Sequence, residues 1–148
     1  MQDGYLIVST NSARPGLVRL RGELDNPFPS AGGPGGLPER GPGDLIVYVA
    51  RFRDLEAALM HFHTGLSRRL VDVNRRLYKA AAADAVAVAQ CIELPHRPIF
   101  IDPDVAQSPQ LEAATARIRR RHRVVRRIFD VVGILALVAL VASSLLKP

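Results

Sequence analysis

The stretch GYLIVSTNSARPGLVRLR, residues 4–21, decides the fold of the first half of the chain. Its first part, 4–10, is a short run rich in residues that favour β-strands, and its last part, 17–21, is a second run of that kind. The segment between them, 11–16, contains asparagine, proline and glycine, which favour turns. The stretch therefore predicts a β-hairpin.

Beyond a glycine- and proline-rich segment at 22–43, which we expect to be a flexible loop, the segment 44–52 (DLIVYVARF) predicts a third, buried strand. A helix should follow, because the next apolar residues recur at helical spacing and Asp54 can cap the first turn. These apolar residues are Leu55, Ala58, Leu59, Phe62 and Leu66. The pattern is that of an amphipathic helix packed on a sheet.

The segment 74–79 (NRRLYK) predicts a short edge strand, and the alanine-rich segment 81–92 predicts a second helix. Residues 1–92 should thus form one α+β domain, a small antiparallel sheet flanked by helices. Residues 93–109 contain four prolines, and we expect a proline-rich linker there because proline interrupts regular structure.

The charge of the chain is unevenly distributed. The net charge is +6 over 148 residues, but residues 1–108 carry twelve basic and twelve acidic residues, so the excess lies entirely in 109–148.

The size allows one domain plus an appendage and excludes two large domains. Cys91 is the only cysteine, which excludes an internal disulfide and a cysteine-based zinc cluster. We expect no cofactor and no metal, and the N-terminus shows no secretory signal.

The C-terminal segment is the most apolar part of the sequence. Residues 131–146 carry no charge, and with Ile128 and Phe129 the stretch 128–146 approaches the about 20 residues that cross a bilayer. The sequence therefore predicts a single-pass, tail-anchored membrane protein with a transmembrane helix at 128–146.

A basic helix at 110–127 precedes the apolar stretch, and in this interpretation it lies beside the membrane. Arginine on one flank of a span is retained in the cytoplasm, which predicts a cytoplasmic N-terminus, and these side chains should contact anionic lipid headgroups. Nucleic acid is the weaker alternative for this cluster. The predicted membrane-interface residues are Arg117, Arg119, Arg120, Arg121, Arg123, Arg126 and Arg127.

Four segments of the first domain occur in an order that resembles the GIY-YIG nuclease superfamily, especially its phage-type DNA-binding branch. Members of that branch show patterns like GYIYVL, PGLVKIG, LE-x-x-LH and NREFF. The matching stretches are GYLIV at 4–8, PGLVRLRG at 15–22, LEAALMHFH at 55–63 and NRRLY at 74–78. The resemblance implies an α+β fold over about residues 4–92 and a surface that once handled nucleic acid.

The departures from the family pattern remove its chemistry. Arg76 stands where the family has the glutamate that binds a divalent metal, and a cation does not ligate a cation. Ile7 matches the second tyrosine of the first motif, and Arg21 matches the motif's glycine unless the register shifts to Gly22. The family's helix that carries the catalytic arginine is replaced here by the glycine- and proline-rich segment. This leaves only Arg40, a poor candidate for the role of the catalytic arginine. The resemblance thus implies a degenerate nuclease that retains the fold without the activity.

The resemblance also selects a set of candidate nucleic-acid-binding residues and no catalytic ones. Their alternative role is that of solvated charges at strand edges, which oppose aggregation. His61 and His63 are unsuited to share a metal, because two residues apart on a helix they point in different directions. The candidates are Tyr5, Arg19, Arg21, His61, His63, Asn74, Arg75 and Arg76.

These observations favour an inactive binding module on the cytoplasmic face of a membrane, with nucleic acid or a protein as its partner. Two alternatives stay open. One is an active membrane-bound endonuclease whose metal carboxylate is Glu56 or Glu39, and the other is a structural membrane protein that acts through protein contacts or as a homo-oligomer.

Overall fold

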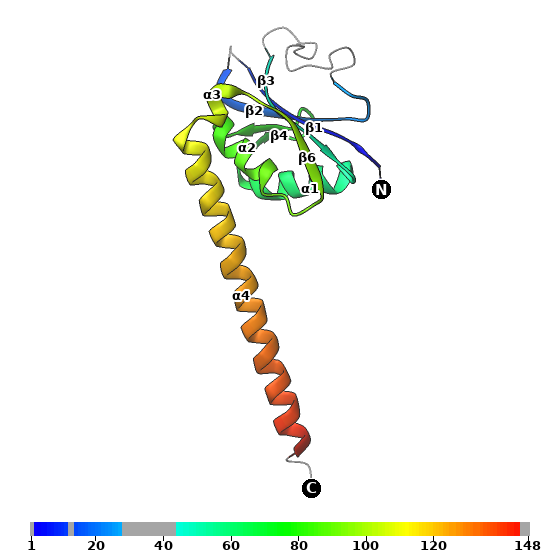
Figure 1. The fold of residues 1–148 in the computed structure, drawn as a ribbon, viewed down its shortest axis with the longest axis vertical. Coiled ribbons are helices and arrows are strands. Elements are labelled where there is room, and N and C mark those ends of the chain that lie inside the picture. The colour runs from blue at the N-terminus through cyan, green and yellow to red at the C-terminus, as the bar shows by residue number, and fades with distance from the viewer. Residues whose placement is uncertain (1, 12–13, 28–43, 146–148) are drawn as a thin grey trace. The chain divides into compact units, whose positions relative to one another are not determined.

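The predicted hairpin forms the centre of the domain in the structure, a computed structural model that describes residues 2–11, 14–27 and 44–145. Strands β1 (Gly4–Asn11) and β2 (Arg14–Glu23) pair antiparallel, with Ile7 opposite Arg21. The chain divides into two units, 1–115 and 116–148. In the first unit the described strands make a six-stranded antiparallel sheet of order β4-β5-β2-β1-β3-β6 (Figure 1).

The other strands are β3 (Asp44–Phe52), β4 (Leu70–Asp72), β5 (Leu77–Lys79) and β6 (His96–Ile101). The helices are α1 (Leu55–Leu66), the 3-10 turn η1 (Ser67–Arg69), α2 (Ala82–Gln90), α3 (Pro103–Ala106) and α4 (Pro109–Leu145). The α+β class with an antiparallel sheet is confirmed. Asp54 caps α1 as expected, because its Oδ1 accepts a hydrogen bond of 3.1 Å from the backbone N–H of Ala57.

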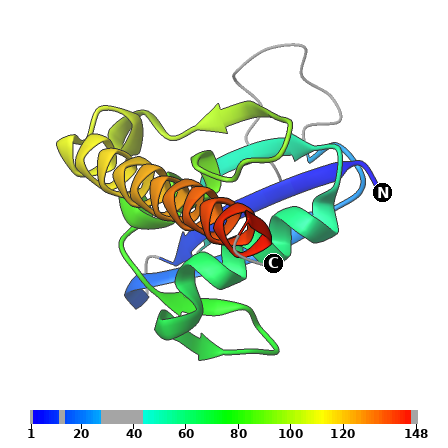
Figure 2. The same cartoon turned by 90° about the horizontal axis from the view of Figure 1, so that it is seen from below.

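Helices α1 and α2 pack against the same face of the sheet. Figure 2 shows the two helices and the strands in a view from below. Two glycines let α1 approach the strands closely. A Cβ atom at Gly4 would lie 2.6 Å from Leu55 Cδ2, and one at Gly22 would lie 2.9 Å from Leu59 Cδ1. Between the helices and the sheet, Phe62 of α1 is fully buried and meets Tyr78 edge to face, with 5.6 Å between the ring centroids. This layer is the main hydrophobic core.

Tyr48 lies in the same core and has a hydroxyl group without a hydrogen-bond partner among the described residues. Burial raises the pKa of its phenol to about 12. The unfolded chain loses this proton near pH 10 whereas the folded chain keeps it, so Tyr48 should lower the free energy of unfolding as the pH rises from about 10 to about 12.

The variant Tyr48→Phe should therefore be at least as stable as the wild type at pH 8, by up to about 1 kcal/mol, because it removes a buried hydroxyl that forms no hydrogen bond. Its stability should also fall less steeply above pH 10. Urea unfolding at pH 8, 10 and 11 measures the free energy of unfolding of both proteins. If this free energy changes with pH by the same amount in both, the raised pKa of Tyr48 is contradicted.

The opposite face of the sheet has a smaller apolar cluster of its own. Ile7, Ile46 and Val49 are buried there, and Tyr5 and Phe100 pack against them. Polar and charged residues continue this face along β2, where Arg19 and Arg21 alternate with the buried Val18 and Leu20 of the helix-covered face. We call this surface the open face.

The region 93–109 is not the linker that its prolines predicted. It contains β6, which pairs with β3, and the short helix α3, whose first turn is capped by Asp102. The physical reason is the position of β6 at the edge of the sheet, because an edge strand tolerates the missing N–H of Pro98. The predicted edge strand at 74–79 is shorter than expected. Its first three residues form a turn, and β4, which the sequence did not indicate, is the actual edge.

The C-terminal helix α4 differs from the predicted membrane anchor. It is a single helix of 37 residues, Pro109–Leu145, whose first half carries the arginine cluster. Within the described part of the chain, no helix combines the length and the apolar character needed to cross a membrane. This finding contradicts the transmembrane helix at 128–146, of which residue 146 lies outside the described residues. It also contradicts the single-pass localisation with a cytoplasmic N-terminus.

Candidate functional site

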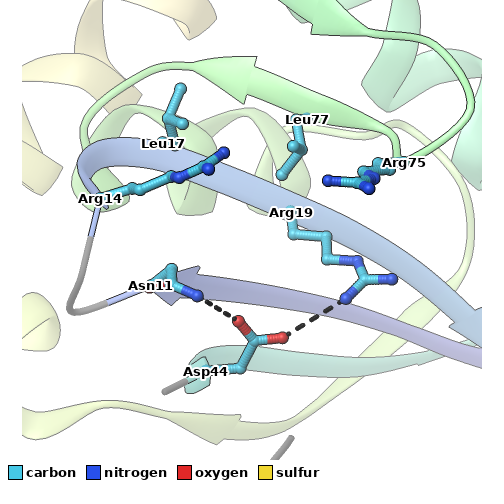
Figure 3. A pocket seen from close by; sticks show the side chains of 7 residues that line it. All are labelled: Asn11, Arg14, Leu17, Arg19, Asp44, Arg75 and Leu77. Carbon is cyan, nitrogen blue, oxygen red and sulfur yellow. Dashed lines mark hydrogen bonds and ion pairs between the residues drawn. The ribbon is translucent and has the colours of Figure 1, made fainter. Parts of the chain in front are cut away.

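Two adjoining hollows lie on the open face, where β2 meets the turn between β4 and β5. The larger, about 460 Å³, is drawn in Figure 3 and is lined by Asn11, Arg14, Leu17, Arg19, Asp44, Arg75 and Leu77. The smaller, about 230 Å³, is lined by Arg19, Leu20, Arg21, Gly22, Glu23, Asn74, Arg75 and Arg76. Because Arg19 and Arg75 line both, the hollows form one continuous site.

The alternation of β2 places its arginines in this site. Leu17, Arg19 and Arg21 occupy every second position, and Arg19 lies opposite Leu77 of β5. Val18 and Leu20, the residues between them, are buried under the helices and hold the strand in register. The hydrophobic core thus determines the direction in which these arginines project.

The turn between β4 and β5 is held by hydrogen bonds to backbone atoms. Asp72 Oδ1 accepts a bond of 3.0 Å from the N–H of Arg75, and the N–H of Leu20 donates to the carbonyl of Arg76 at 3.1 Å. Arg76 has a φ of 48°, a left-handed conformation that non-glycine residues adopt rarely. These contacts fix Asn74, Arg75 and Arg76 beside β2.

Asp44 is the carboxylate that lines the larger hollow, and Figure 3 shows it below Asn11 and Arg19. It is buried, and its Oδ1 accepts a hydrogen bond of 3.1 Å from the amide of Asn11. Its Oδ2 lies 3.5 Å from Nη1 of Arg19 and 4.0 Å from Nη2 of Arg21. One carboxylate therefore lies within ion-pair distance of two guanidinium groups.

The site as a whole has an excess of positive charge. Among the described residues, five arginines line the two hollows, against the carboxylates of Asp44 and Glu23. Arg14 and Arg76 form no ion pair with any residue that the structure describes. Nε of Arg21 is buried and has no hydrogen-bond partner among those residues. The site therefore offers guanidinium donors to an anion.

The structure brings five of the eight sequence-predicted site residues together: Arg19, Arg21, Asn74, Arg75 and Arg76. Tyr5 is on the same face but packs against the Ile7 cluster and lines neither hollow. His61 and His63 are on α1, which covers the other face, and Nδ1 of His63 lies 3.1 Å from the hydroxyl of Tyr78. The two histidines are therefore not part of this site.

Sequence reasoning missed Asn11, Arg14 and Asp44, the residues that complete the larger hollow. Asn11 ends β1 and Arg14 begins β2, but the sequence assigned both to a turn, where polar residues are expected for their backbone conformation alone. Asp44 begins β3, and an acidic residue at the start of a strand gives no local sign that only 9% of it is exposed. Asp44 could have been found from the pairing of β1 with β3, in which it lies opposite Asn11.

The arrangement suits anion binding better than hydrolysis. Among the described residues, no three His, Cys, Asp or Glu side chains lie together so that they could hold a metal ion. Arg76 lines the smaller hollow as a cation. Glu56 is exposed on α1, the helix on the other face, and Glu39 lies outside the described residues.

Comparison with known proteins yields no match: no protein-family model, no curated protein and no solved structure is similar to this chain. The resemblance to the GIY-YIG superfamily therefore rests on the four short motifs alone. The geometry of the open face is the basis on which a function can be assigned.

Proposed function

We propose that this chain is a non-catalytic binding module that recognises nucleic acid through the arginine surface, which consists of Arg14, Arg19, Arg21, Arg75 and Arg76. The observation that supports it most directly is the convergence of these arginines from β2 and from the turn between β4 and β5 on two adjoining hollows. The guanidinium group is planar and donates two parallel hydrogen bonds to phosphate oxygens. Phosphate contacts dominate the affinity of proteins for nucleic acid.

The charge distribution limits the strength of this binding. Residues 1–108 have equal numbers of acidic and basic side chains, so attraction comes from the arginine surface and not from the whole domain. About three phosphate contacts are then expected, which gives a plot of log affinity against log salt concentration with a slope of about −2 to −3. The absence of cleavage is expected from Arg76 in place of a metal ligand.

Asp44 provides the test, because its carboxylate competes with phosphate for Arg19 and Arg21. Asp44→Asn should increase the affinity of the full-length chain for a labelled oligonucleotide about threefold to tenfold, since it removes a negative charge from the site. It should also lower the free energy of unfolding by about 1.5 kcal/mol, because the ion pair with Arg19 is lost and the hydrogen bond from Asn11 no longer has a charged acceptor. Fluorescence anisotropy over a salt series, with magnesium present so that cleavage is detected, measures binding.

The matched control is Asp84→Asn. Asp84 also forms an ion pair with an arginine, Arg69, at 2.8 Å, but neither residue lines a hollow. This variant should bind with the wild-type affinity. No binding by the wild type at low salt, or no difference between Asp44→Asn and Asp84→Asn, would refute the proposed site.

A further inference from the structure

We infer that the larger hollow accepts one nucleotide of an unpaired strand, so that the module selects single-stranded over double-stranded nucleic acid. This inference rests on the proposed function and specifies its ligand. It follows from the lining of the larger hollow, which includes apolar residues that the phosphate backbone of a duplex does not require.

The larger hollow has a mixed lining, in which polar and charged side chains outnumber the apolar ones among the described residues. Its volume of about 460 Å³ falls in the range of about 300 to 1,000 Å³ that ligand pockets occupy. Leu17 and Leu77, both half-buried, form an apolar wall, and Arg14, Arg19 and Arg75 are the cations of the same hollow (Figure 3). A nucleotide combines these properties, because it has an apolar base and sugar surface joined to an anionic phosphate.

A duplex cannot use this apolar wall. Its bases are stacked and paired in the interior of the helix, and a base enters a protein pocket only after it leaves the stack, at a cost of a few kcal/mol. A duplex would therefore contact only the arginines, through its phosphates. An unpaired strand can place a base and sugar against Leu17 and Leu77 without that cost, and this difference is the origin of the selectivity.

The smaller hollow extends the site along the strand. It shares Arg19 and Arg75 with the larger one and adds Arg21, Asn74 and Arg76. Successive phosphates of one strand can therefore be bound by overlapping sets of arginines. None of the described residues that line either hollow is aromatic, so stacking on aromatic rings, which supplies much of the affinity of other single-strand binders, does not contribute at this site.

The test compares a single-stranded oligonucleotide of twelve nucleotides with the duplex of the same sequence, both labelled, at low salt and with the full-length chain. The wild type should bind the single strand at least about tenfold more tightly. Leu77→Trp fills the larger hollow but retains every arginine, so it should weaken single-strand binding about tenfold and leave duplex binding within about twofold. Val73→Trp, at a neighbouring position that is 70% exposed and lines neither hollow, should change neither affinity.

The outcomes separate the two proposals. Equal affinity for single strand and duplex, or a Leu77→Trp variant that binds the single strand like the wild type, overturns the inference and leaves the proposed function standing. No binding of either nucleic acid overturns both. If circular dichroism shows that Leu77→Trp does not fold, Leu17→Trp fills the same hollow from the same apolar wall and carries the same comparison.

Discussion

Replacement of both Arg19 and Arg75 with alanine is expected to weaken the binding of single-stranded nucleic acid about 100-fold at low salt. These two side chains are the ones that line both hollows, so their removal affects the whole arginine surface. A charged hydrogen bond to phosphate that contributes about 1.4 kcal/mol corresponds to about a tenfold change in affinity, and two such bonds give the expected factor. The slope of log affinity against log salt concentration should decrease in magnitude by about 0.7 for each phosphate that the variant no longer neutralises.

The control for this experiment is the double variant Arg68→Ala plus Arg97→Ala. Both arginines are exposed and lie outside the hollows, so the control removes the same charge from the domain. It should reduce affinity no more than about twofold. Anisotropy titrations of the full-length proteins at four salt concentrations measure both effects. A further variant, Arg119→Gln plus Arg120→Gln plus Arg121→Gln, tests the basic part of α4. If this triple variant binds more weakly than the wild type while the Arg19 and Arg75 variant binds like the wild type, the ligand is held by α4 instead.

The largest effect on stability is expected from Phe62→Ala, which should reduce the free energy of unfolding by about 3 to 5 kcal/mol. Phe62 is completely buried between α1 and the sheet and contacts Tyr78 edge to face. Its removal leaves a cavity in the layer that holds β2 and β5 in register. The decrease in stability includes both the burial of the ring and the aromatic contact.

Urea unfolding followed by circular dichroism measures this change. The matched control is Met60→Ala on the same helix, because Met60 is 71% exposed and its truncation should change stability by no more than about 0.5 kcal/mol. A decrease of less than about 1 kcal/mol for Phe62→Ala would show that α1 does not pack on the sheet as described.

The structure explains why some elements could be predicted and others could not. The hairpin, the third strand and α1 were predictable because each shows a local pattern, namely strand formers around a turn or apolar residues at helical spacing. Strand β6 was not predictable, because Pro98 interrupts the local pattern and only its place at the edge of the sheet makes the strand possible. The predicted span at 128–146 was likewise based on local hydropathy, and the described part of α4 does not support it.

The position of Arg19 and Arg21 on one face of β2 follows from local alternation along the strand, whereas their selection as site residues came from the motif resemblance. Only the tertiary structure decided what lies next to them. Asp44 reaches Arg19 from a strand that begins twenty-five residues later, and the turn with Arg75 and Arg76 is placed by the pairing of β5 with β2. Tertiary structure also placed His61 and His63 on the opposite face, since α1 buries its apolar side against the sheet. Contacts between distant segments depend on the pairing and packing of whole elements, which no local pattern encodes.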